Sequence, residues 1–212
     1  MNGIVQLESD QYRLLVGVRY LNASEAICKG LQRQLGVNDF HFLITLRSFI
    51  EYTRRGIWFL VWANEGTLKK AEELTFQRPG SPSLQTMDAL INEALGKGKT
   101  STLMNKTPGI NEPFLNCLHA LTHGNPISVR MIAFGLDKIF DFGGMMAKVG
   151  IELGIFRIIF YRRMLGDDIN SIWTILASIH DRPDEVRTIA LIAADLLKKS
   201  GKLASPLGLQ LP

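Results

Sequence analysis

The side chains best suited to chemistry near neutral pH lie in the segment Asn116–Pro126, which reads NCLHALTHGNP. Its apolar spacing predicts a helix, on which Asn116, His119 and His123 fall within about 60° of one another. An imidazole titrates near pH 7, so each histidine could act as a general acid or base. His119 and His123 are therefore candidate catalytic residues, and Asn116 is a candidate binding residue on the same face.

The end of this helix leaves more than one role open for the face. Gly124 can take the left-handed position that ends a helix, and Pro126 prevents the helix from continuing. His123 then lies in the last turn, where a protonated imidazole interacts favourably with the helix dipole. The face is either structural or solvated, or it lines a polar active or binding cleft, for which Asn125 is a further candidate binding residue.

Two familiar ligand-binding patterns are incomplete in this chain. The i,i+4 spacing of the histidines lets two imidazoles reach one metal ion, but Ala120 stands where a zinc metalloprotease needs a glutamate. The stretch 98–100 imitates the end of a phosphate-binding loop, but Glu93 replaces the first glycine and a helix precedes it. We therefore expect no metal and no other cofactor.

A second group of charged side chains lies on a long helix earlier in the chain, predicted at 38–64. Arg47 and Arg54 project at the margin of its apolar sector, and a half-buried guanidinium is costly unless it is paired. Glu51, one turn after Arg47, is the expected intrahelical partner. These residues either hold the bundle together or form the cationic wall of a functional cleft. In the second case Arg47 is a candidate catalytic residue, and Glu51 and Arg54 are candidate binding residues. The apolar sector consists of Leu43, Leu46, Ile50, Ile57 and Val61.

The apolar spacing is helical nearly throughout the chain, and convincing alternating strands are absent. We expect an all-α fold, a multi-helix bundle of about eight or nine helices in a single domain, 1–212. The bundle is centred on 38–165, and the N- and C-terminal helices either pack around it or mediate dimerisation. The residues Gly143 and Gly144 are expected to break or kink the chain between two helices. The helices are expected at 9–35, 38–64, a short stretch from 67, 83–96, 111–123, 126–142, 145–165, 168–179 and 183–199.

Composition excludes several classes of protein. A hydrophobic content of 46% with a net charge of only +4 argues against disorder. Charged residues interrupt the oily stretch Phe134–Tyr161, and the N-terminus lacks the pattern of a signal peptide. Cys28 and Cys117 form no CxxC pair and are expected to be small buried hydrophobes. We expect a soluble cytoplasmic protein with no membrane segment, whose dispersed basic residues do not by themselves establish a polyanion partner.

Two segments together give a family resemblance. LRSFIEYTRRGIWFL (Leu46–Leu60) and LHALTHGNP (Leu118–Pro126) resemble bacterial helical families of unknown function related to the HEPN superfamily. The resemblance covers roughly residues 39–142. It implies a helical bundle, commonly a homodimer, of a kind that occurs in toxin–antitoxin and phage-defence systems and sometimes cleaves RNA.

The resemblance also implies roles for particular residues. Arg47 and Glu51 match the Arg-x-x-x-Glu element of these families, and His123 with Gly124 matches their His-Gly element. HEPN ribonucleases place an arginine a few residues before a catalytic histidine on one helix, and no Arg–His pair here has that spacing. Nuclease activity would therefore need Arg47 and His123 to meet across the bundle.

Three functions follow from these patterns. The leading one is a protein that acts mainly by binding, as a homodimer, with RNA or a partner protein. The alternative is a metal-independent ribonuclease, with His119 or His123 as the general acid/base and Arg47 stabilising the phosphorane. The third is small-molecule binding in the bundle core, which requires an apolar pocket with a few convergent polar groups.

Overall fold

The computed structural model describes residues 9–64, 66–68, 82–95 and 114–165. These residues are mainly helical and include no strand, so the all-α prediction is confirmed for the described ranges. The helices predicted at 168–179 and 183–199 and the stretch 98–100 lie outside them. The helices are α1 (Ser9–Gln34), α2 (Asp39–Val61), α4 (Leu84–Leu95), α5 (Phe114–His123), α6 (Pro126–Phe134), α7 (Leu136–Ile139) and α8 (Phe142–Leu165).

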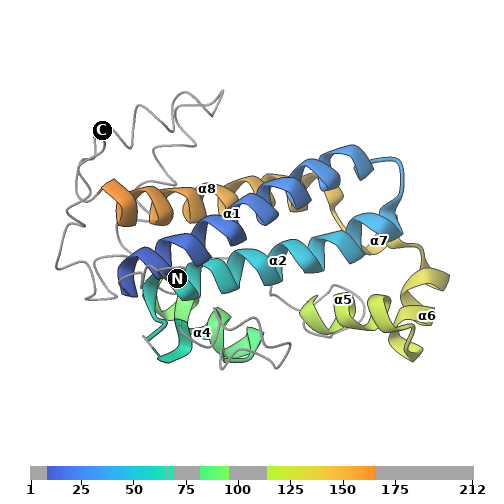
Figure 1. Cartoon of the computed structure of the whole chain (residues 1–212). Helices are drawn as coiled ribbons and strands as arrows, with labels where there is room; N and C mark the ends of the chain where they lie inside the picture. Colours follow the sequence, from blue (N-terminus) through green and yellow to red (C-terminus); the bar gives the residue numbers. More distant parts are fainter. Residues whose placement is uncertain (1–8, 65, 69–81, 96–113, 166–212) are drawn as a thin grey trace, which may run out of the picture.

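Three long helices form the body of the fold (Figure 1). α1 and α2 are joined by a tight turn and run antiparallel, and α8 packs against both. α4 and α5 also contact α2, and α6 and α7 lead the chain from α5 to α8. α2 is therefore the central element of the bundle. All five members of its predicted apolar sector are buried: Leu43, Leu46, Ile50, Ile57 and Val61.

The connections at the helix ends follow the capping residues of the sequence. Gly36 adopts a φ of +72° after α1, a conformation that favours glycine. Asn38 caps α2, because its Oδ1 accepts a hydrogen bond of 2.9 Å from the backbone N–H of His41. Ser83 Oγ accepts from the N–H of Thr86 at 3.2 Å before α4. The predicted starts of these two helices are confirmed.

Two glycines let the long helices approach closely. A Cβ atom on Gly56 of α2 would lie 2.1 Å from the ring of Phe156 on α8. A Cβ atom on Gly17 of α1 would lie 2.5 Å from Cδ2 of Leu60 on α2. Each glycine therefore accepts a large side chain of the neighbouring helix directly against its backbone.

The path between α5 and α8 differs from the sequence prediction. The helix predicted at 126–142 ends at Phe134 because Gly135 adopts a φ of +95°, and the short α7 follows. The predicted break at Gly143 and Gly144 is also wrong, since both lie in the first turn of α8. Asp141 explains the difference. Its Oδ1 accepts a hydrogen bond of 2.9 Å from the N–H of Gly144, so Asp141 caps α8 about one turn before the predicted start at 145.

Cys28 and Cys117 are both buried, as predicted. Within the described ranges, no helix has the length and apolar character needed to span a bilayer.

Candidate functional site

The histidine helix α5 has the two faces that its sequence predicts. Asn116, His119 and His123 are exposed, and the imidazole centroids of the two histidines are 4.3 Å apart. The opposite face is buried and attaches α5 to α2. Chemistry-bearing side chains are therefore presented to solvent on a firmly packed helix. The buried residues are Phe114, Cys117, Leu118, Ala120 and Leu121.

The end of α5 is built as the sequence indicates. Gly124 has a φ of +64°, and Asn125 then caps α6. The Oδ1 atom of Asn125 accepts hydrogen bonds from the N–H groups of Ile127 at 3.0 Å and Ser128 at 3.4 Å. Asn125 thus holds the start of α6, which leaves its side-chain oxygen engaged rather than presented to a ligand.

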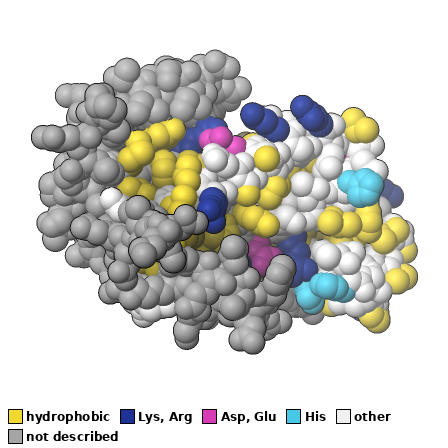
Figure 2. Space-filling view, in the orientation of Figure 1, with side chains coloured by type: hydrophobic (Ala, Val, Ile, Leu, Met, Phe, Trp, Pro, Cys, Tyr) yellow, Lys and Arg dark blue, Asp and Glu magenta, His cyan; other side chains and the backbone are white. Residues whose placement is uncertain are grey.

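Arg47 on α2 is near enough to the histidine face for its charge to act on His119, because α5 packs on α2. The pKa of His119 is lowered from its ordinary value of 6.5, first by partial desolvation, then by the positive charges of Arg47 and His123. Basic, acidic and histidine side chains lie together on one face of the molecule, near α5 (Figure 2). Residues far apart in the sequence therefore share one electrostatic environment, in which His119 is mainly neutral at pH 7.

Glu51 does not pair with Arg47, contrary to the prediction. Oε1 of Glu51 instead accepts two hydrogen bonds from Arg55, one from Nε at 3.1 Å and one from Nη2 at 3.0 Å. The glutamate precedes the arginine by four residues, which is the more favourable order on a helix. In the described part of the chain no carboxylate forms an ion pair with Arg47.

Arg54 lies in the core rather than on the surface. Its NH2 group donates a hydrogen bond of 2.8 Å to Oε1 of Glu152 on α8, and the two side chains are 2% and 8% exposed. A buried guanidinium needs such a partner. The sequence left open whether Arg54 holds the bundle together or lines a cleft. In the structure it holds two helices together.

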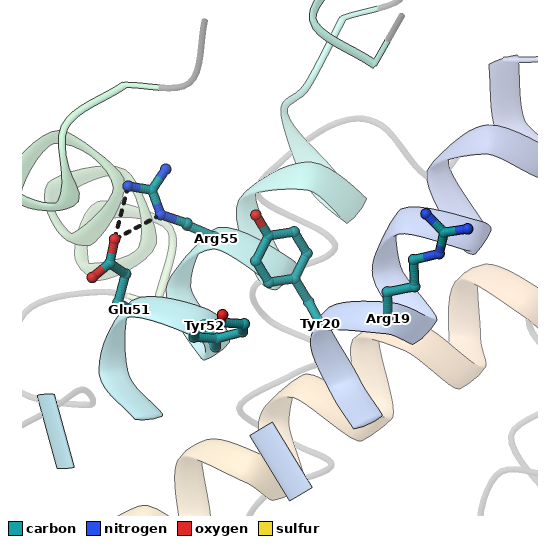
Figure 3. Close-up of a pocket in the computed structure, with 5 residues that line it drawn as sticks. All are labelled: Arg19, Tyr20, Glu51, Tyr52 and Arg55. Atoms are coloured by element: carbon teal, nitrogen blue, oxygen red, sulfur yellow. Dashed lines mark hydrogen bonds and ion pairs between the residues drawn. The ribbon is translucent and has the colours of Figure 1, made fainter. Parts of the chain in front are cut away.

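We call one group of side chains the α2–α5 cluster: Arg47, His119 and His123, with Asn116 beside them. Glu51 lies one turn from Arg47 on α2 but belongs to a second feature, a pocket that the sequence did not reveal. This pocket has a volume of about 240 Å³ and lies between α1 and α2 (Figure 3). Its lining comprises Arg19, Tyr20, Glu51, Tyr52 and Arg55.

The α1–α2 pocket is aromatic and charged. Tyr20 packs its ring on Phe59 at a centroid distance of 5.5 Å and lies 5.7 Å from Tyr52. Burial raises the pKa of Tyr20, the charge of Arg55 opposes this, and Tyr52 and Glu51 add to the rise. Its hydroxyl therefore remains a hydrogen-bond donor at neutral pH. Small-molecule binding in the bundle core, the third function derived from the sequence, stays a prediction.

Within the described ranges, no group of three or more His, Cys, Asp or Glu side chains is arranged to hold a metal ion. The two histidines of α5 therefore find no further zinc ligand among the residues that the structure describes. Comparison of the chain with known protein families, curated proteins and solved structures finds no match.

Proposed function

We propose that this chain is a HEPN-like helical-bundle protein of the cytoplasm that acts mainly by binding RNA through the α2–α5 cluster. One observation carries the proposal: the packing of α5 on α2 brings Arg47 near the exposed face of His119 and His123, so that its charge acts on His119. Because Glu51 is engaged by Arg55, the cationic character of Arg47 is not cancelled by that carboxylate. The cluster therefore offers positive charge and exposed imidazoles at one place.

A phosphodiester is the ligand that fits this chemistry best. An arginine presents planar N–H donors that match phosphate oxygens, and a nearby anion favours the protonated form of an imidazole. Arg47 is half-buried, so its side chain loses less conformational freedom on binding than a fully exposed arginine would. RNA is proposed among the phosphodiesters because the families that the sequence resembles include proteins that cleave RNA.

The binding function is tested with a fluorescein-labelled RNA by anisotropy over a series of salt concentrations. Arg47→Gln should weaken binding and lower the salt slope by about 0.7 to 0.9, the value for one lost phosphate contact. Arg33→Gln is the matched control, because it removes the same charge from an exposed position at the end of α1. Equal losses in the two variants would reduce the effect to net charge and contradict the proposed site.

A second candidate function, metal-independent RNA cleavage, is favoured by the lowered pKa of His119. A neutral His119 can remove the proton from a ribose 2′-hydroxyl, whose oxygen then attacks the adjacent phosphorus. The imidazole of His123 can pass a proton to the departing 5′-oxygen, and Arg47 can stabilise the phosphorane. The products are a 2′,3′-cyclic phosphate and a free 5′-hydroxyl.

Cleavage is tested by incubating end-labelled RNA with the wild type, His123→Ala and His41→Ala. His41 is exposed in the first turn of α2 and serves as the matched control for a lost histidine. Loss of cyclic-phosphate product in His123→Ala alone supports the enzyme. If neither the wild type nor His41→Ala forms this product, the ribonuclease proposal fails.

We also propose that the chain forms a homodimer, as the resemblance implies. α6 supports this because it leaves three large apolar side chains largely in solvent: Val129, Ile132 and Phe134, at 63%, 53% and 66% exposure. Exposed apolar groups gathered on one element are typical of association surfaces. Light scattering coupled to size exclusion tests this, and a monomer mass at micromolar concentration would rule the dimer out.

A further inference from the structure

Two tyrosine rings and the guanidinium of Arg55 contribute to the lining of the α1–α2 pocket. Tyr20 is fixed from behind by Phe59, and Tyr52 stands beside it with 42% of its surface exposed. The guanidinium of Arg55 is held by two hydrogen bonds to a single oxygen of Glu51. Figure 3 shows the tyrosines between this Arg55–Glu51 pair and Arg19. Aromatic rings and guanidinium planes are the groups on which unpaired bases stack.

The size of the pocket limits what it can hold. Its volume of about 240 Å³ lies below the range of about 300–1,000 Å³ that is usual for drug-sized ligands. One ring system fits this space better than an extended cofactor. Both bonds from Arg55 go to Oε1 of Glu51, so this ion pair forms one charged edge of the pocket beside the tyrosines.

The pocket and the α2–α5 cluster lie along the same helix. Arg47, Glu51 and Arg55 follow one another at intervals of four residues, so they share one side of α2. At a rise of 1.5 Å per residue, the Cα atom of Arg47 lies about 12 Å from that of Arg55. A short extended strand can span this distance with a phosphate at Arg47 and a base at the tyrosines.

Charge at the pocket favours a nucleotide over a neutral aromatic molecule. Arg55 and Glu51 compensate each other as an ion pair, whereas Arg19 is exposed at the rim. A cation at the rim suits the phosphate that follows the stacked base. A base-paired duplex cannot use such a pocket, since its bases are stacked on one another.

We propose that the α1–α2 pocket receives one unpaired base of single-stranded RNA whose backbone passes over the α2–α5 cluster. This inference rests on the RNA-binding function proposed above and narrows its substrate to unpaired RNA. Tyr20 and Tyr52 provide the stacking surface, and Arg19 lies near the next phosphate.

The experiment compares a labelled single-stranded oligoadenylate with the same strand annealed to its complement, by anisotropy on the full chain. Tyr52→Ala should weaken binding of the single strand about tenfold, because it removes one stacking contact, and should leave duplex binding unchanged. Tyr52→Phe keeps the ring and should bind within about twofold of the wild type. Arg47→Gln, measured in parallel, should weaken binding of both forms.

The outcomes separate this inference from the proposed function. If Tyr52→Ala and Tyr52→Phe bind the single strand equally well while Arg47→Gln weakens binding, the pocket proposal fails and RNA binding stands. Equal affinity of the wild type for single strand and duplex would also overturn the pocket proposal alone. If the wild type binds neither form at low salt, both proposals fall together.

Discussion

Arg54 of α2 and Glu152 of α8 form an ion pair of 2.8 Å inside the helical bundle, with both side chains almost completely buried. The two residues join the central helix to the helix that closes the described part of the fold. Removing two charges from water is costly, so the pair stabilises the fold only as long as both partners are present.

The first prediction concerns this pair. Arg54→Ala should destabilise the fold by about 3–5 kcal/mol, because it leaves the Glu152 carboxylate buried without its arginine. The double variant Arg54→Met with Glu152→Leu should recover most of the loss, since two apolar side chains of similar size replace the charges. Urea unfolding followed by circular dichroism measures the free energy of unfolding of each variant.

A more exposed ion pair provides the control. Arg157 of α8 donates to Glu25 of α1 at 2.8 Å, but these side chains are 16% and 33% exposed. Arg157→Gln should therefore cost only about 0–1 kcal/mol. Equal losses for Arg54→Ala and Arg157→Gln would show that burial of the Arg54–Glu152 pair has no special effect on stability.

The ends of the helices were readable from sequence because each depends on a few adjacent residues. Gly36 and Asn38 mark the α1–α2 turn, and Gly124 ends α5, as expected from their types. The break expected at Gly143 failed for the same local reason: Asp141 is a strong N-cap, and glycine is tolerated in a first turn. Local rules therefore give most of the elements but rank competing signals poorly.

The composition of the site was less predictable because it depends on packing between distant segments. The face of α5 could be derived from helical periodicity, but the approach of Arg47 to His119 required α5 to pack on α2. The pairing of Glu51 with Arg55 is the exception, because the local preference for a glutamate four residues before an arginine favours it over Arg47. Tyr20 enters the pocket from α1, and no spacing rule links it to α2.

A second prediction tests the close contact between α2 and α8. Gly56→Ala should destabilise the fold by about 1–3 kcal/mol, because the new methyl group would overlap the ring of Phe156. Combining Gly56→Ala with Phe156→Leu should relieve the overlap in part. Gly30→Ala is the control: its Cβ meets nothing within 4 Å, and alanine in a helix should stabilise by about 0.5–1 kcal/mol. Thermal unfolding gives these differences, and a stable Gly56→Ala would refute the close approach.

A third prediction concerns the C-terminal end of α2. The buried guanidinium of Arg13 donates to the carbonyl oxygens of Phe59 at 2.8 Å and Ala63 at 2.7 Å. The last turn of α2 contains no basic residue, so Arg13 brings positive charge to the negative end of the helix dipole from α1. Arg13→Met should cost about 2–3 kcal/mol, because it removes both charged hydrogen bonds.

Hydrogen exchange locates the effect of that substitution. In Arg13→Met, amide protection should fall in the last two turns of α2 more than around Asn38 at its start. Arg19→Met, at an exposed position of the same helix, is the control for loss of a charge. Uniform loss of protection along α2 would mean that Arg13 acts on the whole bundle and does not cap this end.

The last prediction uses the lowered pKa of His119. Arg47→Gln should raise this pKa toward 6.5, because it removes one of the positive charges that oppose protonation, whereas the contributions of desolvation and His123 remain. A phosphate bound at the cluster should also raise it, since an anion favours the charged imidazole. RNA affinity should therefore increase as the pH falls through the pKa of His119. NMR titration of the imidazole signals, with and without inorganic phosphate, measures both shifts, and the His41 signals report whether the variant is folded. If the titration of His119 is identical in the wild type and Arg47→Gln, the two side chains are not coupled and the α2–α5 cluster is not a site.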